Sequence, residues 1–177
     1  MRNLVLCCLL LVAAAMLAAC LDPVRNARRT VGVIEATTAT AELDVAHGAR
    51  MVILDAAEAE GHRRGQELKA AGCGPANATQ PSSALVDPCK GVVAASEARL
   101  AKRVAEIQGA QRRADGAIDG VYAALRIVTK FLRSLTDPKP QGWEASLMAC
   151  VGAAIKASAD CVEAVAKFKT AIKGGSK

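Results

Sequence analysis

Aromatic side chains are scarce in this chain: its 177 residues include one Trp, one Tyr and two Phe. Aromatic rings usually form the platforms on which sugars or bases stack, and they line many cavities that hold apolar ligands. The composition therefore disfavours both kinds of site. Hydrophobic residues still reach 52%, and much of this share is alanine, which favours close contact between helices over a thick globular interior.

Signatures of catalysis are also lacking. The sequence has two histidines and contains no nucleophile elbow, phosphate-binding glycine loop, Cys-x-x-Cys pair or zinc-ligand spacing. Asp55, Glu58 and His62 recur at i, i+3 and i+7, so they share the helical face that a metal or acid–base site would need. Because Arg63 and Arg64 adjoin them, we interpret Glu58 and His62 as a solvated helical pair. The sequence predicts no enzyme, no cofactor and no metal site.

The N-terminus is the most informative stretch. One early positive charge, Arg2, precedes an apolar run from Leu4 to Leu17 and then Ala18-Ala19-Cys20. A basic start, a hydrophobic middle and small residues at the cut are the layout of a secretory signal peptide. A signal peptide cut elsewhere, or a transmembrane helix, is the alternative. The apolar run is at the short edge of a membrane span, and Asp22-Pro23 stops it.

Leu17-Ala18-Ala19-Cys20 resembles the lipobox of bacterial lipoproteins. The resemblance implies that residues 1–19 are a signal peptide and that Cys20, as the new N-terminus, carries a diacylglycerol thioether and is N-acylated. Leu21, not aspartate, follows the cysteine, which by the sorting rule of enteric-type lipoproteins implies the outer membrane, facing the periplasm. The resemblance covers these four positions, and residues 21–177 indicate no family.

Cysteine usage fits this compartment. An even number of cysteines in an oxidising environment indicates disulfides. Four cysteines are left once Cys20 and the signal peptide are set aside: Cys73, Cys89, Cys150 and Cys161. Cys73 and Cys89 bracket the most loop-like stretch and are predicted to pair. Cys150 and Cys161 lie eleven residues apart, ~16 Å along one helix, which is too far for a disulfide.

Heptad spacing predicts three helices, at about 24–71, 90–135 and 143–172. The second has the strongest seam, formed by Leu100, Val104, Ile107, Gln111, Ala114, Ile118, Val121, Leu125, Val128, Leu132 and Leu135. The first has a weak seam. A kink or fraying is expected there, because Gly32, Gly48, Gly61 and Gly65 each cost up to ~1 kcal/mol relative to alanine.

Two connectors join these helices, and their lengths indicate the topology. Residues 72–89 form a loop with three prolines, and residues 136–142 form a tight turn. Amphipathic helices joined in this way predict an all-α fold, an antiparallel three-helix bundle of coiled-coil type. Residues 20–177 are one domain's worth of chain.

The charge of the chain, +6 with a pI near 9.1, points to an anionic partner or a solvated surface. For a secreted chain the polyanions are phospholipid headgroups, lipopolysaccharide or cell-wall polymers, and nucleic acid is not expected. Arg25, Arg28 and Arg29 lie within ten residues of Cys20 and are predicted to be membrane-proximal, where each would add ~1 kcal/mol against anionic lipid. The groups Arg99/Lys102/Arg103 and Arg112/Arg113 are expected to be solvated.

In an antiparallel bundle the 136–142 connector returns to the anchored end of the molecule. Lys139 and Trp143 are therefore expected near the headgroups, where Trp and basic residues are favoured. A packing role at the start of the third helix is the alternative for Trp143.

Two function classes remain. The first is a membrane-tethered envelope lipoprotein that acts as a structural or protein-interaction module with an unknown envelope protein as partner. The second is a carrier of a lipid or small hydrophobic ligand, which would want a cavity that this composition does not supply. Lys177, after Gly174-Gly175-Ser176, resembles the C-terminal lysine that joins the major outer-membrane lipoprotein to peptidoglycan. A lysine there by chance is the alternative.

Overall fold

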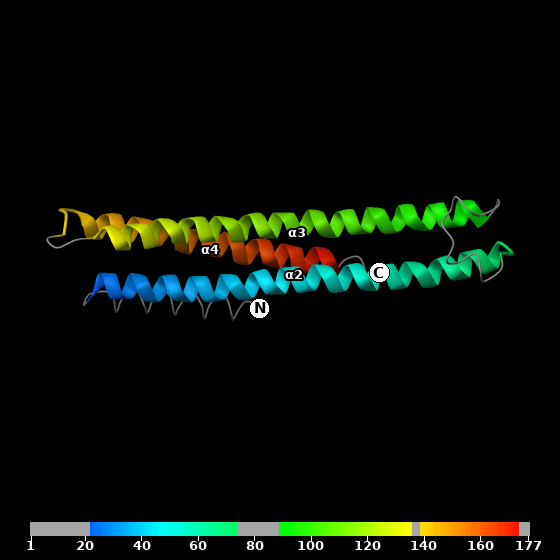
Figure 1. The fold of residues 1–177 in the computed structure, drawn as a ribbon, viewed down its shortest axis with the longest axis horizontal. Helices are drawn as coiled ribbons and strands as arrows, with labels where there is room; N and C mark the ends of the chain where they lie inside the picture. Colours follow the sequence, from blue (N-terminus) through cyan, green and yellow to red (C-terminus); the bar gives the residue numbers. More distant parts are fainter. Residues whose placement is uncertain (1–21, 74–88, 136–138, 174–177) are drawn as a thin grey trace. The chain divides into compact units, whose positions relative to one another are not determined.

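The computed structural model describes residues 22–73, 89–135 and 139–173, which are 93% helical and contain no strand. The helices are α2 (Pro23–Ala70), α3 (Cys89–Ser134) and α4 (Trp143–Lys173) (Figure 1). The three pack against each other, so the predicted all-α three-helix bundle is confirmed. Two residues named in the sequence analysis, Cys20 and Lys177, lie outside the described residues.

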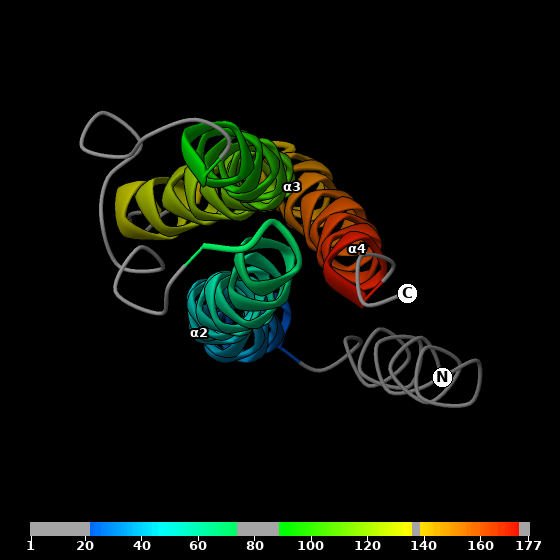
Figure 2. The ribbon, with the colours of Figure 1, turned by 90° about the vertical axis from the view of Figure 1, so that its right-hand side faces the viewer.

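Contacts between the helices divide the chain into two compact units, and each helix contributes to both. Unit 1 takes α2 up to Leu43, α3 from Ala114 and α4 up to Ala166. Unit 2 takes the remainder: α2 from Asp44, α3 up to Arg113 and α4 from Lys167. In each unit α3 runs antiparallel to α2 and α4, as the sequence colours in Figures 1 and 2 show.

The sequence at the start of α2 is suited to a helix N-terminus. Asp22 Oδ1 accepts the backbone N–H of Arg25 at 3.0 Å, which satisfies one of the donors that a helix start leaves unpaired. Pro23 takes the first helical position, where its missing N–H is not needed. The Asn26 N–H donates to the Asp22 carbonyl at 3.1 Å. The helix is therefore capped only two residues after Cys20 in the sequence.

Heptad positions fill the core of unit 1. The buried members are Ala27, Ile34 and Thr38 of α2, Ala114, Ile118, Val121, Leu125, Val128 and Leu132 of α3, and Leu147, Val151, Ala154, Cys161 and Val165 of α4. The polar member, Thr38, donates its hydroxyl to the Ile34 carbonyl at 2.7 Å, so no unpaired polar group is left in this seam at Thr38. Burial of these side chains is the main stabilising contribution to the unit.

The core of unit 2 is built around Phe168, which is 2% exposed. A Cβ atom added to Gly48 would lie 3.4 Å from Phe168 Cε1, an ordinary van der Waals distance, so the ring packs against α2 at this position. Val45 and Ile107 are buried in the same unit. No fraying is found at the glycines of α2, which is one continuous helix from Pro23 to Ala70.

A Schellman motif ends α2 and positions a disulfide. Gly72, at φ 74°, donates its N–H to the Lys69 carbonyl at 3.1 Å, and the Cys73 N–H donates to the Leu68 carbonyl at 2.9 Å. Cys73 is bonded to Cys89, the first residue of α3, with the Cα atoms 6.1 Å apart. The predicted disulfide is therefore confirmed. Leu68 and Cys89 pack with Val93 in a small core beside it.

Candidate functional site

The sequence analysis places the lipid on Cys20, which is outside the described residues. The nearest described feature is the start of α2 at Pro23. Only Leu21 and Asp22 stand between the cysteine and this helix in the sequence. A group carried by Cys20 would thus be joined to unit 1 through a very short linker.

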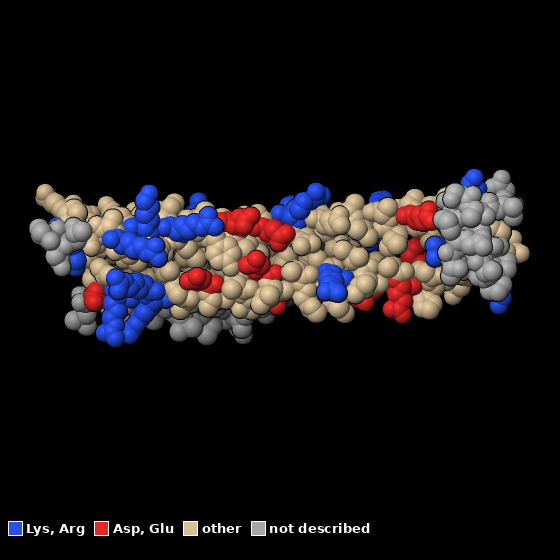
Figure 3. All heavy atoms as spheres, in the orientation of Figure 1, with Lys and Arg blue, Asp and Glu red and all other residues tan. Residues whose placement is uncertain are grey.

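Six exposed basic side chains gather where α2 begins and α3 ends, and we call this set the basic end of unit 1. Its members are Arg25, Arg28 and Arg29 of α2 and Arg126, Lys130 and Arg133 of α3. Figure 3 shows Lys and Arg side chains clustered over these two helix segments. Within the described ranges, none of the six side chains pairs with a carboxylate.

Only the α2 half of the basic end, Arg25, Arg28 and Arg29, is predictable as membrane-proximal from the sequence. Arg126, Lys130 and Arg133 recur at steps of four and three residues, so they form a row along one face of α3. Their spacing alone is typical of a solvated face. This row lies near the start of α2 because α3 runs antiparallel to α2. Residue spacing within α3 alone does not predict that the two groups of basic residues lie at the same end of unit 1.

Lys139 and Trp143 lie in the same unit, at the start of α4. Gly142 has φ 78°, and the Trp143 N–H donates to the Pro140 carbonyl at 3.2 Å, which closes the turn before the helix. The Lys139 Nζ atom lies 4.5 Å from the centroid of the Trp143 ring, a cation–π contact. Trp143 is half-buried. Its placement near headgroups stays a prediction.

A group of carboxylates lies further along unit 1. Burial raises the pKa of Asp115, and the negative charges of Asp119 and Glu42 raise it further. The Tyr122 hydroxyl donates to Glu42 Oε2 at 3.0 Å. Burial, this hydrogen bond and nearby acidic charge raise the pKa of Tyr122. The described residues contain no cluster of three His, Cys, Asp or Glu that could hold a metal ion.

The face that carries Asp55, Glu58 and His62 is exposed on α2. His62 Nε2 lies 3.8 Å from Glu58 Oε1, and the two side chains are 79% and 75% exposed. This is the solvated helical pair that we inferred from the sequence.

Arg99 and Arg103 differ from the expectation of a solvated charged surface. Arg99 donates from α3 to Glu60 Oε1 at 2.6 Å and Glu67 Oε2 at 2.8 Å, both on α2. Burial raises the pKa of Glu60, but hydrogen bonds from Arg99 and Ser96 and nearby positive charge outweigh it, so that pKa is lowered overall. Arg103 donates to the Ile172 carbonyl at 3.1 Å. These side chains link the helices of unit 2.

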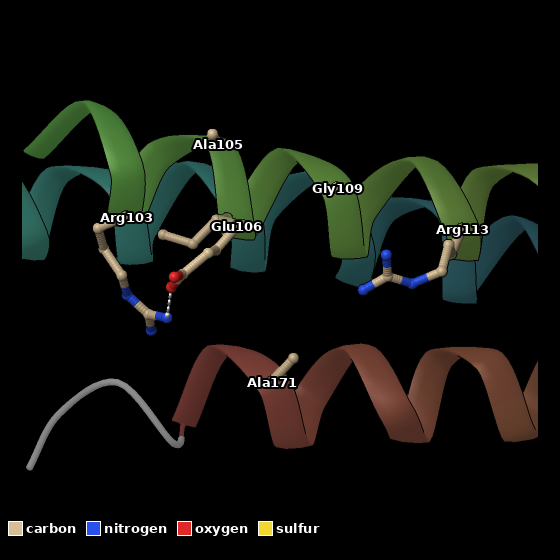
Figure 4. Close-up of a pocket in the computed structure, with 7 residues that line it drawn as sticks. Arg103, Ala105, Glu106, Gly109, Arg113 and Ala171 are labelled. Atoms are coloured by element: carbon tan, nitrogen blue, oxygen red, sulfur yellow. Dashed lines mark hydrogen bonds and ion pairs between the residues drawn. The ribbon is translucent and has the colours of Figure 1, made fainter.

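A pocket of about 360 Å³ lies in unit 2 between α3 and the last turns of α4 (Figure 4). Its lining includes Arg103, Glu106 and Arg113 together with Ile107 of α3 and Ala171 of α4. Arg103 and Glu106 form an ion pair at 3.4 Å. Three of the pocket's seven lining residues are charged and none is aromatic, which does not suit an apolar ligand.

Two cysteines of α4 are free thiols. Cys150 is half-buried and Cys161 is buried. Burial raises the pKa of Cys161, which keeps this thiol protonated and a poor nucleophile. The continuity of α4 from Trp143 to Lys173 agrees with the expectation that these two residues are too far apart to pair.

Among the described residues, α4 is the one helix long and apolar enough to cross a membrane, judged by length and composition, with a mean hydropathy of 1.4 over its most apolar stretch. A helix in the core of a bundle meets the same criterion. Of this stretch 22% is buried in the bundle, and the buried side chains of α4 include Leu147, Val151, Ala154, Cys161, Val165 and Phe168. Comparison with known proteins finds no family model, curated protein or solved structure that matches this chain.

Proposed function

We propose that the protein is a membrane-tethered envelope lipoprotein, anchored through Cys20, that acts as a structural or protein-interaction module. The observation that carries the proposal is Leu17-Ala18-Ala19-Cys20, followed two residues later by a capped helix. Such an arrangement couples an acylated N-terminus directly to a folded bundle. The outer membrane, facing the periplasm, is the compartment that Leu21 favours.

Contact with a protein partner is supported by large apolar side chains on the outer face of α2. In unit 1, Val33 is 62% and Leu43 is 72% exposed. Both point away from the buried seam of Ile34 and Thr38, given the angular step of a helix. Covering an exposed apolar side chain is favourable, so these two positions are where we expect a protein partner to make contact with α2.

The carrier function has less support. The heptad side chains fill the interior of unit 1, and the pocket in unit 2 has three charged residues and no aromatic ring in its lining. A carrier needs an apolar cavity that shields its ligand from water. An interaction module needs only a stable helical surface, which α2, α3 and α4 supply.

Metabolic labelling tests the anchor. Cells fed with a clickable palmitate should label the wild-type protein but not Cys20→Ser, and the labelled protein should fractionate with the outer membrane. The control variant Cys161→Ser removes a buried thiol of α4 and should keep the label. Label that persists in Cys20→Ser contradicts the anchor, and label with inner-membrane fractionation contradicts the sorting.

Site-specific crosslinking tests the contact function. A photo-reactive residue at Leu43 should give a discrete crosslinked species in cells, while one at the exposed polar residue Gln108 of α3 should not. Equal crosslinking from both positions would show that Leu43 does not mark a specific contact surface.

A further inference from the structure

We propose that the basic end of unit 1 is a binding surface for anionic phospholipid headgroups. The surface would hold the bundle against the bilayer beside the acyl chains of Cys20. This inference rests on the proposed function, because the anchor is what brings this end of α2 to a membrane. It adds a recognition surface that the lipid alone does not provide.

The charge balance of this region is the first argument. The six side chains of the basic end and Lys139 are exposed. The acidic residues in the same stretches of the sequence are Asp22, Asp137 and Glu144. Asp22 is engaged as the cap of α2. Because the six side chains have no carboxylate partner within the described residues, their charge is available to an external anion.

The position of the arginines on α2 is the second argument. Arg25, Arg28 and Arg29 occupy the first two turns of the helix, which has no acidic residue in its first turn. The N-terminal end of a helix carries partial positive charge, so cations placed there are disfavoured. The folding of α2 gains nothing from these charges, which points to a role outside the bundle. Arg133, in the last turn of α3, has the favourable polarity and would be explained by the dipole alone.

The kinds of side chain match the proposed ligand. Five of the six members of the basic end are arginines, and a guanidinium presents a planar fork of donors that suits phosphate oxygens. The Lys139–Trp143 pair adds an amphipathic ring and an ammonium group, a combination favoured at the level of lipid headgroups. The cations of the basic end are spread over several helical turns, so they need several anionic groups at the same time. A headgroup surface supplies many phosphates side by side.

Apart from Asp22 and Glu144, the described acidic residues of unit 1 are set back from this surface. Asp119 precedes Arg126 by seven residues on α3, which is ~10 Å along the helix. That distance is about one screening length at physiological salt. The negative charge around Asp115 and Glu42 therefore weakens the attraction of the basic end for an anionic bilayer only slightly.

The only tryptophan of the chain, Trp143, makes the proposal measurable. The lipidated full-length mature protein is inserted into preformed vesicles of phosphatidylcholine, or of phosphatidylcholine mixed with phosphatidylglycerol. Spin-labelled lipid with the label at headgroup level then reports on Trp143 by quenching its fluorescence. We expect strong quenching only in the anionic vesicles, and we expect high salt to reverse it.

Neutral variants identify the residues responsible. In Arg126→Gln/Lys130→Gln/Arg133→Gln, each lost charge should weaken headgroup contact by roughly fivefold, so that quenching in anionic vesicles falls to the phosphatidylcholine level. The control, Lys90→Gln/Lys102→Gln/Arg112→Gln, removes the same charge from exposed positions of α3 in unit 2 and should keep the wild-type signal. Circular dichroism of both variants verifies that the helices are intact.

The outcomes separate this inference from the proposed function. Equal quenching in neutral and anionic vesicles, or equal loss in the two triple variants, overturns the headgroup surface while a palmitate label on Cys20 still supports the tether. A wild-type protein without that label overturns the proposed function, and the headgroup surface falls with it.

Discussion

Asp115 carries a charge that its surroundings in unit 1 disfavour. It is half-buried on α3, next to the buried Ala114. Burial raises its pKa above the ordinary value of 3.8, and the charges of Asp119 and Glu42 raise it further. An acid whose pKa is higher in the folded state than in the unfolded state lowers the stability of the fold at neutral pH.

We therefore predict that Asp115→Asn stabilises the protein at pH 7. The gain should shrink as the pH falls through the raised pKa of the folded state and vanish below the ordinary value, where Asp115 is protonated in both states. Urea unfolding followed by circular dichroism at several pH values measures this. Asp160→Asn, at an exposed position of α4, is the control and should have little effect. A gain for Asp115→Asn that is the same at pH 3 and pH 7 would contradict the assignment.

At the scale of one element, two residues of α3 that are close in the sequence lie on opposite sides of the helix, one in the buried seam and one on the outer face. Leu125 is 5% exposed and Ile127 is 60% exposed. Leu125→Asp puts an unpaired charge into the core of unit 1 and leaves a cavity, which should cost at least about 4 kcal/mol. Ile127→Asp, the matched control, should change stability by less than about 0.5 kcal/mol. Thermal melting of both variants tests the seam, and similar melting temperatures would show that the seam is not a core.

The part of unit 2 next to the Cys73–Cys89 disulfide is stabilised by fewer contacts than the part that includes α4. Within the described residues, α4 reaches only to Lys173, near Arg103, which donates to the Ile172 carbonyl. Beyond that point α2 and α3 are held together by the Leu68–Cys89–Val93 core, the ion pairs of Arg99 and the disulfide. A section with so few buried apolar side chains opens more readily than a full three-helix core.

We predict that the disulfide protects this section in particular. The bond joins residues 16 positions apart, and in the chain-entropy model a loop of that size contributes ~3 kcal/mol. In Cys73→Ser/Cys89→Ser, amide hydrogen exchange should accelerate in residues 55–70 and 89–103 and stay slow in residues 118–132. Cys150→Ser is the control for loss of a thiol. Uniform acceleration along all three helices would contradict the local role of the disulfide.

The success of the sequence analysis follows from heptad spacing. Each predicted helix end lies within one residue of the structure, because a packed seam fixes both the period and the length of these helices. Arg99 was expected to be solvated, yet it reaches Glu60 and Glu67 on another helix. The α3 row of the basic end was missed for the same reason. Contacts between helices depend on how far each helix is shifted along its neighbour and on which face it turns toward that neighbour. Neither can be read from the spacing of residues within one helix.

At the scale of the whole molecule, α4 is the element that could change the topology in a membrane. Its hydropathy permits a span, but a spanning α4 would expose Leu147, Val151 and Phe168 to lipid and leave the seams of α2 and α3 without their third partner. All three side chains are buried in the bundle. Lys156 lies near the middle of α4 and is exposed, and a span would carry its charge into the hydrocarbon at considerable cost.

Lys156 therefore discriminates a tethered bundle from a spanning helix. In the lipidated protein inserted into preformed vesicles, a membrane-impermeant amine reagent should acylate Lys156 as readily as it does in detergent, because α4 stays packed on α2 and α3 outside the bilayer. Lys102 of α3, exposed in unit 2, is the control and should react equally in both conditions. Lys130, in the basic end, should react more slowly in anionic vesicles than in neutral ones, since headgroups would cover it. A Lys156 that reacts only after detergent is added would place α4 in the bilayer and would replace the tethered bundle with a spanning one.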